Sequence, residues 1–147
     1  MRFSALFVAV TLWALEGRAQ SWDVEGVTIV CDPETATPAD VVSSRANAQY
    51  LTNIDTGERP VNGAGPENCG QIACNWGSAI EWCNDTPQPM TLDNFTVIAD
   101  AWNLMNSKLT SGADDDCVIL QLGALSVAGE IFHPDGFSVR IRGGVSC

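Results

Sequence analysis

Six cysteines offer the clearest chemistry in this 147-residue chain: Cys31, Cys69, Cys74, Cys83, Cys117 and Cys147. Zinc sites normally use closely spaced cysteine pairs, or cysteine together with histidine. Here the spacings are long and irregular, no CxxC pair occurs, and His133 is the only histidine. An even number of cysteines in an exported protein is typical of disulfides. The sequence therefore predicts three disulfides of undetermined pairing, with no metal and no cofactor.

Export is predicted by residues 1–19, which have the pattern of a secretory signal peptide. Arg2 precedes an apolar run over residues 3–15, and the small residues Gly17 and Ala19 lie before the expected cut. A spanning helix needs about 20 apolar residues, more than this run supplies, so no membrane span is expected. We expect residues 20–147 to form one secreted, extracellular, monomeric domain.

A hydrolytic site can be drawn from three residue types in the chain. Glu81 would act as general base, His133 as general acid, and Arg140 or Arg142 would bind an anion. Against this, no GxSxG motif occurs, and no free thiol is expected as a nucleophile. His133 precedes Pro-Asp-Gly, which favours an exposed turn. We therefore expect no enzyme.

Arg140 and Arg142 have two interpretations. They alternate along a predicted strand, so they can neutralise carboxylates across a sheet. Alternatively, they form a possible binding face. The formal net charge of −11 repels nucleic acid and anionic membranes, so no nucleic-acid partner is expected, whereas a cationic partner is compatible.

Two further sequence patterns concern N-glycosylation and calcium binding. Sequons at Asn84 and Asn94 predict glycosylation, although Pro87 weakens the first of them. Asp114 to Asp116 lack the ligand spacing of a calcium loop, so we interpret them as a solvated loop.

The elements that must position these residues follow from periodicity and turn signals. The sequence predicts strands over 27–31, 78–83 and 137–142, and a strand over 118–122 that extends past Gly123 to Phe132. It predicts a helix from Thr37-Pro38 to about Leu51 and a longer one from Thr91 or Asp93 to Leu109. Residues 53–68 are rich in Gly, Pro and Asn and predict a loop.

Side-chain patterns assign an inner face to each element. Ile80 and Trp82 face inward on one strand, and Phe137, Val139 and Ile141 do so on the last strand, with Ser138 and both arginines outward. The first helix would bury Val42, Ala46 and Tyr50, and the second Phe95, Ile98, Ala101, Trp102, Met105 and Leu109. The result is an α+β fold of order β-α-β-α-β-β, with two helices packed on one face of a mainly antiparallel sheet.

The whole layout, and above all the segment CNWGSAIEWCND from Cys74 to Asp85, resembles small secreted cysteine-rich proteins of filamentous fungi. Within that group it is similar to killer-toxin-like and secreted-effector-like α/β domains, whose final strand also ends at a cysteine. The resemblance implies a non-enzymatic secreted factor that binds a protein or cell-surface component of a host or competing microbe.

Two other functions stay open. Residues 39–58 resemble the first helix of small acidic guanyl-specific fungal ribonucleases, which implies a secreted ribonuclease-like hydrolase; those enzymes use two histidines, and this chain has one. The remaining alternative is a non-toxic structural protein of the cell wall.

Overall fold

The computed structural model describes residues 20–31, 37–54, 57–107, 117–121 and 123–147. The predicted signal peptide, Leu109, and Asp114 to Asp116 lie outside these residues. Two helices and mainly antiparallel strands form the described part, which confirms the α+β class. In chain order the elements are β1 (Thr28–Cys31), β2 (Ala39–Asp40), α1 (Val41–Asn53), β3 (Val61–Asn62), β4 (Asn68–Asn75), β5 (Ser78–Asn84), β6 (Met90–Thr91), α2 (Thr96–Ser107), β7 (Val118–Gln121), β8 (Ala124–Val127), β9 (Gly129–His133) and β10 (Phe137–Gly143).

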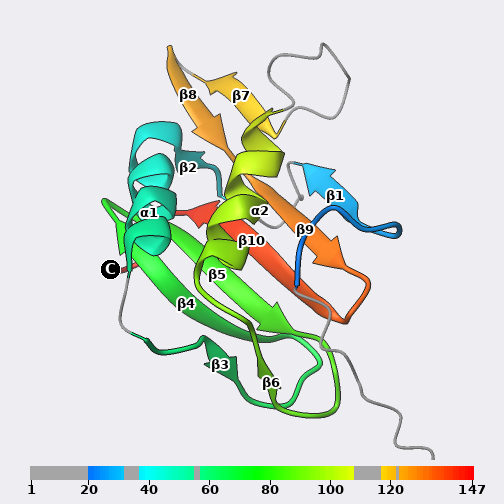
Figure 1. The fold of residues 1–147 in the computed structure, drawn as a ribbon. Helices are drawn as coiled ribbons and strands as arrows, with labels where there is room; N and C mark the ends of the chain where they lie inside the picture. The colour runs from blue at the N-terminus through cyan, green and yellow to red at the C-terminus, as the bar shows by residue number, and fades with distance from the viewer. Residues whose placement is uncertain (1–19, 32–36, 55–56, 108–116, 122) are drawn as a thin grey trace, which may run out of the picture.

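A five-stranded antiparallel sheet of order β1-β9-β10-β5-β4 is the centre of the fold (Figure 1). Strand β10 buries Phe137, Val139 and Ile141 completely, as its alternation predicted. Val139 lies opposite Trp82 of β5, and Ile141 lies opposite Ile80. These residues form the floor of the hydrophobic core.

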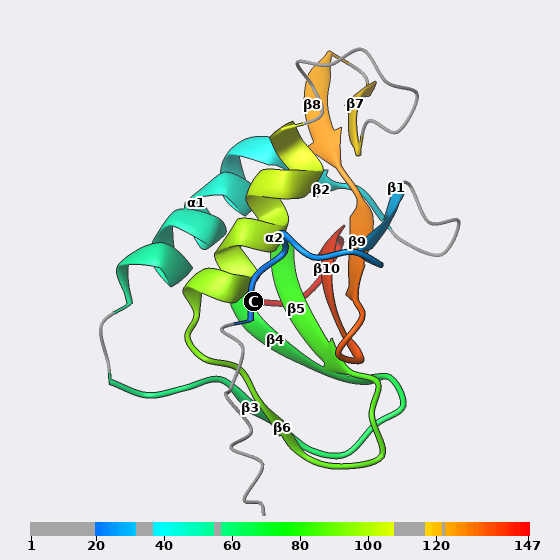
Figure 2. The same cartoon turned by 45° about the vertical axis from the view of Figure 1, so that its right-hand side comes forward.

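Both helices cover the same face of this sheet (Figures 1 and 2). Helix α2 buries Ile98, Ala101, Trp102 and Met105, which belong to its predicted apolar stripe. The helix begins at Thr96, later than predicted, and the Asn94 side-chain oxygen accepts a hydrogen bond from the Val97 amide at 3.1 Å. Burying one stripe against the sheet leaves the opposite side of α2 exposed.

Helix α1 turns its predicted apolar stripe to solvent. Val42 and Tyr50 are 74 % and 61 % exposed, and Ala46 is exposed as well. Ser44 can occupy a core position because its hydroxyl accepts a hydrogen bond from the Trp102 indole nitrogen at 3.1 Å. A buried polar group that is hydrogen-bonded in this way is tolerated in a core. The buried side of the helix is Val41, Ser43, Ser44, Asn47, Ala48 and Leu51.

The start of α1 also differs from the prediction, which placed the cap at Thr37. The N-cap is Asp40, whose carboxylate accepts hydrogen bonds from the backbone N–H and the hydroxyl of Ser43, both at 2.8 Å. An aspartate at this position satisfies an amide that has no partner within the helix. Residues 39 and 40 instead form β2, which pairs with β8.

The predicted strand order was incomplete. Strand β4 begins at Asn68, inside the predicted loop, and pairs with β5 along its length, with a register shift between Gln71 and Ala73. The single strand predicted over 118–132 is three strands, because β7 and β8 form a separate hairpin before β9 enters the main sheet. Strands β3 and β6 form a further two-stranded ladder.

All six cysteines form disulfides, as predicted. The pairs are Cys31–Cys117, Cys69–Cys83 and Cys74–Cys147. The second joins directly opposed residues of β4 and β5. In the described part of the chain, neither helix has the length and apolarity needed to cross a membrane.

Candidate functional site

The arginines of β10 lie on the helix-free face of the sheet, and each binds a carboxylate of a neighbouring strand. Arg142 donates from Nε and Nη2 to Glu81 Oε1 at 2.9 and 2.6 Å. Arg140 donates to both carboxylate oxygens of Glu130 at 3.0 and 3.1 Å. This confirms the predicted neutralisation across the sheet. To act as a binding face, these arginines would first have to release their carboxylates.

Ser138 lies on the outer face of β10 with the two arginines, as predicted, but it is buried beside their ion pairs. Its hydroxyl donates to Glu130 Oε1 at 2.8 Å. Alternation assigns a residue to a face of the sheet, whereas the long neighbouring side chains decide whether that face reaches water.

His133 caps the exposed hairpin turn after β9, as predicted, while its own side chain is buried. Its Nδ1 accepts the Asp135 backbone N–H at 3.1 Å, so Nε2 carries the hydrogen donated to the Ser21 carbonyl at 3.0 Å. The ring stacks on Phe137 at 4.5 Å between centroids and meets Trp22 edge-on at 5.3 Å. His133 therefore holds the N-terminal segment against the sheet.

The structure does not bring Glu81 and His133 together. Glu81 shares the helix-free face with Arg140, its direct neighbour across the β5–β10 ladder. His133 stacks on Phe137, which belongs to the helix-covered core. The ribonuclease-like set of Glu81, His133 and Arg140 is thus divided between two faces of the sheet.

The two sequons lie in contrasting surroundings. Asn84 is fully buried, and its amide nitrogen donates to the Gly63 and Gln88 carbonyls, both at 2.7 Å. A glycan on Asn84 is therefore incompatible with this fold. Asn94 is exposed just before α2, where its side-chain nitrogen can carry a glycan. Glycosylation of Asn94 stays a prediction.

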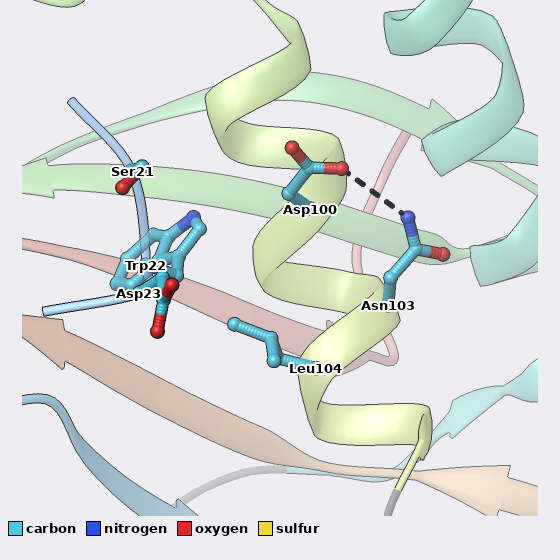
Figure 3. A pocket seen from close by; sticks show the side chains of 6 residues that line it. All are labelled: Ser21, Trp22, Asp23, Asp100, Asn103 and Leu104. Carbon is cyan, nitrogen blue, oxygen red and sulfur yellow. Dashed lines mark hydrogen bonds between the residues drawn. The ribbon is translucent and has the colours of Figure 1, made fainter. Parts of the chain in front are cut away.

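A pocket of about 540 Å³ opens between the N-terminal segment and α2 (Figure 3). Spacing of three and four residues along α2 places Asp100, Asn103 and Leu104 on one side of the helix. Trp22 anchors the facing wall, since its indole nitrogen donates to the Val97 carbonyl at 2.6 Å. The lining residues are Ser21, Trp22, Asp23, Asp100, Asn103 and Leu104.

The charges of this pocket are both negative. Asp23 comes from the N-terminal segment and Asp100 from α2, and Leu104 points toward Trp22 and Asp23 (Figure 3). Neither carboxylate forms an ion pair with a basic side chain among the residues the structure describes. Asp100 has only a long contact with the Asn103 amide, at 3.5 Å. Such a pocket can bind a cation on an apolar stem, because the stem can contact the apolar side chains and the charged group can contact a carboxylate.

Sequence patterns did not reveal this pocket. Asp100 and Asn103 belonged to the polar side of a predicted helix, and Trp22 lay in a segment without predicted structure. The one available signal was Leu104, an apolar residue outside the predicted stripe of α2. Within the described ranges, no group of three or more His, Cys, Asp or Glu side chains is placed to hold a metal ion.

Comparisons with protein-family models, with curated proteins and with solved structures found no match.

Proposed function

We propose that this chain is a secreted protein that acts without catalysis, by binding a protein or cell-surface component of a host or competing microbe. The resemblance to cysteine-rich effector and killer-toxin-like domains supports this proposal, and three disulfides are compatible with an extracellular setting.

The observation that carries the proposal is the pair of carboxylates around an apolar pocket. A lysine or arginine side chain of the target fits this chemistry. Its hydrocarbon stem lies along Trp22 and Leu104, and its charged group lies between Asp23 and Asp100. The net charge of −11 adds long-range attraction for a basic target surface.

A variant pair separates the pocket from net charge. Asp23→Asn with Asp100→Asn removes both pocket carboxylates. Glu25→Gln with Glu67→Gln removes the same charge from exposed positions outside the pocket. Each exposed charge pair contributes at most about 1 kcal/mol, so the pocket variant should bind a cation roughly tenfold more weakly.

The first assay measures binding directly. Butylguanidinium, which carries one guanidinium group on an apolar chain, is titrated into the ¹⁵N-labelled protein. The Trp22 indole signal should shift with saturation in the wild type and the control variant, and only weakly in the pocket variant. An equal response in the pocket variant would show that the cation binds elsewhere.

The second assay measures the biological effect. Purified protein is infiltrated into leaf tissue and added to yeast and filamentous fungi, with a reduced and alkylated sample as control. Cell death, immune suppression or growth arrest should require intact disulfides and the pocket carboxylates. RNA cleavage without any cellular effect would favour the ribonuclease-like alternative, and retention in the wall fraction without harm would favour the structural one.

A further inference from the structure

A second surface, on the other side of α1 from α2, combines exposed aromatic residues with an absence of charge. A groove of about 390 Å³ runs between α1 and the edge strand β4. Ala46 and Tyr50 line it from the helix, and Ile72 and Asn75 line it from the strand. Trp76 follows Asn75 directly in the turn after β4, so it is next to the groove in the chain without being one of its lining residues. We call this surface the Trp76 groove.

Trp76 occupies a conformation that suits few residues with a side chain. Asn75 pairs with Ser78, so residues 76 and 77 form a two-residue turn between β4 and β5. Both have positive φ, +48° at Trp76 and +73° at Gly77. Such turns favour Asn-Gly, whereas a bulky L-residue at the first position is strained.

The fold gains no packing in return for this strain. The Trp76 side chain is 88 % exposed, the highest value among the exposed large apolar residues. Tyr50, on the helix wall of the groove, is 61 % exposed. Strained backbone that supports no internal packing is a pointer to function.

The Trp76 groove is uncharged in an acidic protein. No charged residue lines it, and residues 68–80 contain none. Arg45, the one charged residue of α1, lies over the Trp102 ring at 5.8 Å instead of lining the groove. The side-chain amide of Asn75 has no hydrogen-bond partner within the described residues, which leaves it available to a ligand.

We propose that the Trp76 groove binds a neutral oligosaccharide. The flat, apolar faces of pyranose rings match the exposed Trp76 and Tyr50 rings, and sugar hydroxyls match an amide such as Asn75. A neutral ligand is favoured because the surface offers no ion pair. Protein partners instead are recognised largely through aromatic residues together with arginine and charged rims. This site is separate from the acidic pocket, so either proposal can fail alone.

The test uses hexasaccharides of β-1,3-linked glucose, β-1,4-linked glucose and β-1,4-linked N-acetylglucosamine, with polygalacturonate as an acidic comparison. Calorimetry and the Trp76 indole NMR signal report binding to the full secreted chain. At least one neutral hexasaccharide should bind with saturation, and raising the salt from low to high concentration should leave its affinity unchanged. Polygalacturonate should not bind.

Two substitutions probe the groove without disturbing the fold. Trp76→Asn creates the Asn-Gly sequence that the turn prefers, and Tyr50→Ala places a good helix former on an exposed helix position. Each should weaken sugar binding at least tenfold, while Trp76→Asn also raises the melting temperature. Leu125→Ala, which trims an exposed apolar residue of β8, is the matched control and should bind as the wild type.

Four outcomes would overturn the proposal. The first is no response of the Trp76 indole to any neutral hexasaccharide, and the second is undiminished binding by Trp76→Asn. The third is a lowered melting temperature of that variant, which would mean that Trp76 packs within the fold. The fourth is a concentration-dependent dimer that Trp76→Asn abolishes, which would assign the surface to protein contact instead.

Discussion

Arg140 is predicted to stabilise the fold by neutralising Glu130, so replacing it should destabilise the protein. Arg140→Met keeps an unbranched apolar stem along the sheet and removes the guanidinium group. Glu130 then loses two hydrogen bonds, at 3.0 and 3.1 Å. Among the side-chain donors of the described residues, it keeps only the Ser138 hydroxyl, at 2.8 Å.

The size of the effect follows from the exposure of the two partners. Breaking a fully buried ion pair costs about 3–5 kcal/mol, whereas an exposed pair contributes about 0–1 kcal/mol. The Glu130 side chain is 11 % exposed and that of Arg140 is 30 % exposed, which places this pair between the limits. We expect Arg140→Met to lower the free energy of unfolding by about 2 kcal/mol. This corresponds to a melting temperature lower by about 6–10 °C.

Urea denaturation with the disulfides intact measures this loss, and a double-mutant cycle isolates the pair. Glu130→Met combined with Arg140→Met should be more stable than Arg140→Met alone, because no unpaired carboxylate remains. Arg45→Met is the control, since it removes an exposed guanidinium that only overlies Trp102. If Arg140→Met unfolds at the same urea concentration as the wild type, the ion pair contributes nothing and the reasoning fails.

Three other substitutions test the cap, a tight backbone contact and the exposed sequon. Hydrogen bonds from the Ser43 amide and hydroxyl lower the pKa of Asp40 below its ordinary value of 3.8. The stability that this cap provides is therefore fully present above pH 3.8 and is lost as the pH falls through the lowered pKa. Asp40→Ala should therefore cost about 1 kcal/mol in neutral urea titrations, and an unchanged deficit at the lowest accessible pH would contradict this origin. Gly143→Ala should lower the free energy of unfolding by at least about 1–3 kcal/mol, because the new Cβ would overlap the Pro38 backbone carbonyl; a wild-type melting curve would refute the contact. Protein secreted from a eukaryotic host should carry a glycan that Asn94→Gln removes, and an unchanged intact mass would show that the site is unused.

The parts of the fold that could be predicted are those with strong periodicity. Strand β10 alternates without interruption, and helix α2 carries a continuous apolar stripe. The buried side of helix α1 was predicted wrongly because apolar residues occur all around this helix. Tertiary contacts therefore decided which side is buried. The Trp102 hydrogen bond to Ser44 is such a contact, and residue spacing does not reveal it.

Strand β4 and the two candidate sites were missed for other physical reasons. The β4 segment contains Gly70 and shifts its register after Gln71, so it lacks the alternation that marks a strand. The acidic pocket joins Asp23 to Asp100, and only the folded chain brings such distant residues together. The number of disulfides followed from the predicted export and an even cysteine count, whereas their pairing required the arrangement of the strands.

The disulfide pattern also determines what a single proteolytic cut can do. The loops closed by Cys31–Cys117 and Cys74–Cys147 overlap, so every peptide bond between Cys31 and Cys147 lies within at least one covalent loop. One cut anywhere in that range leaves the fragments joined. A cut just before Cys31, in contrast, leaves the segment that carries Trp22 and Asp23 held by noncovalent contacts alone. One proteolytic cut would thus detach one wall of the acidic pocket from the covalent frame and leave the Trp76 groove on it.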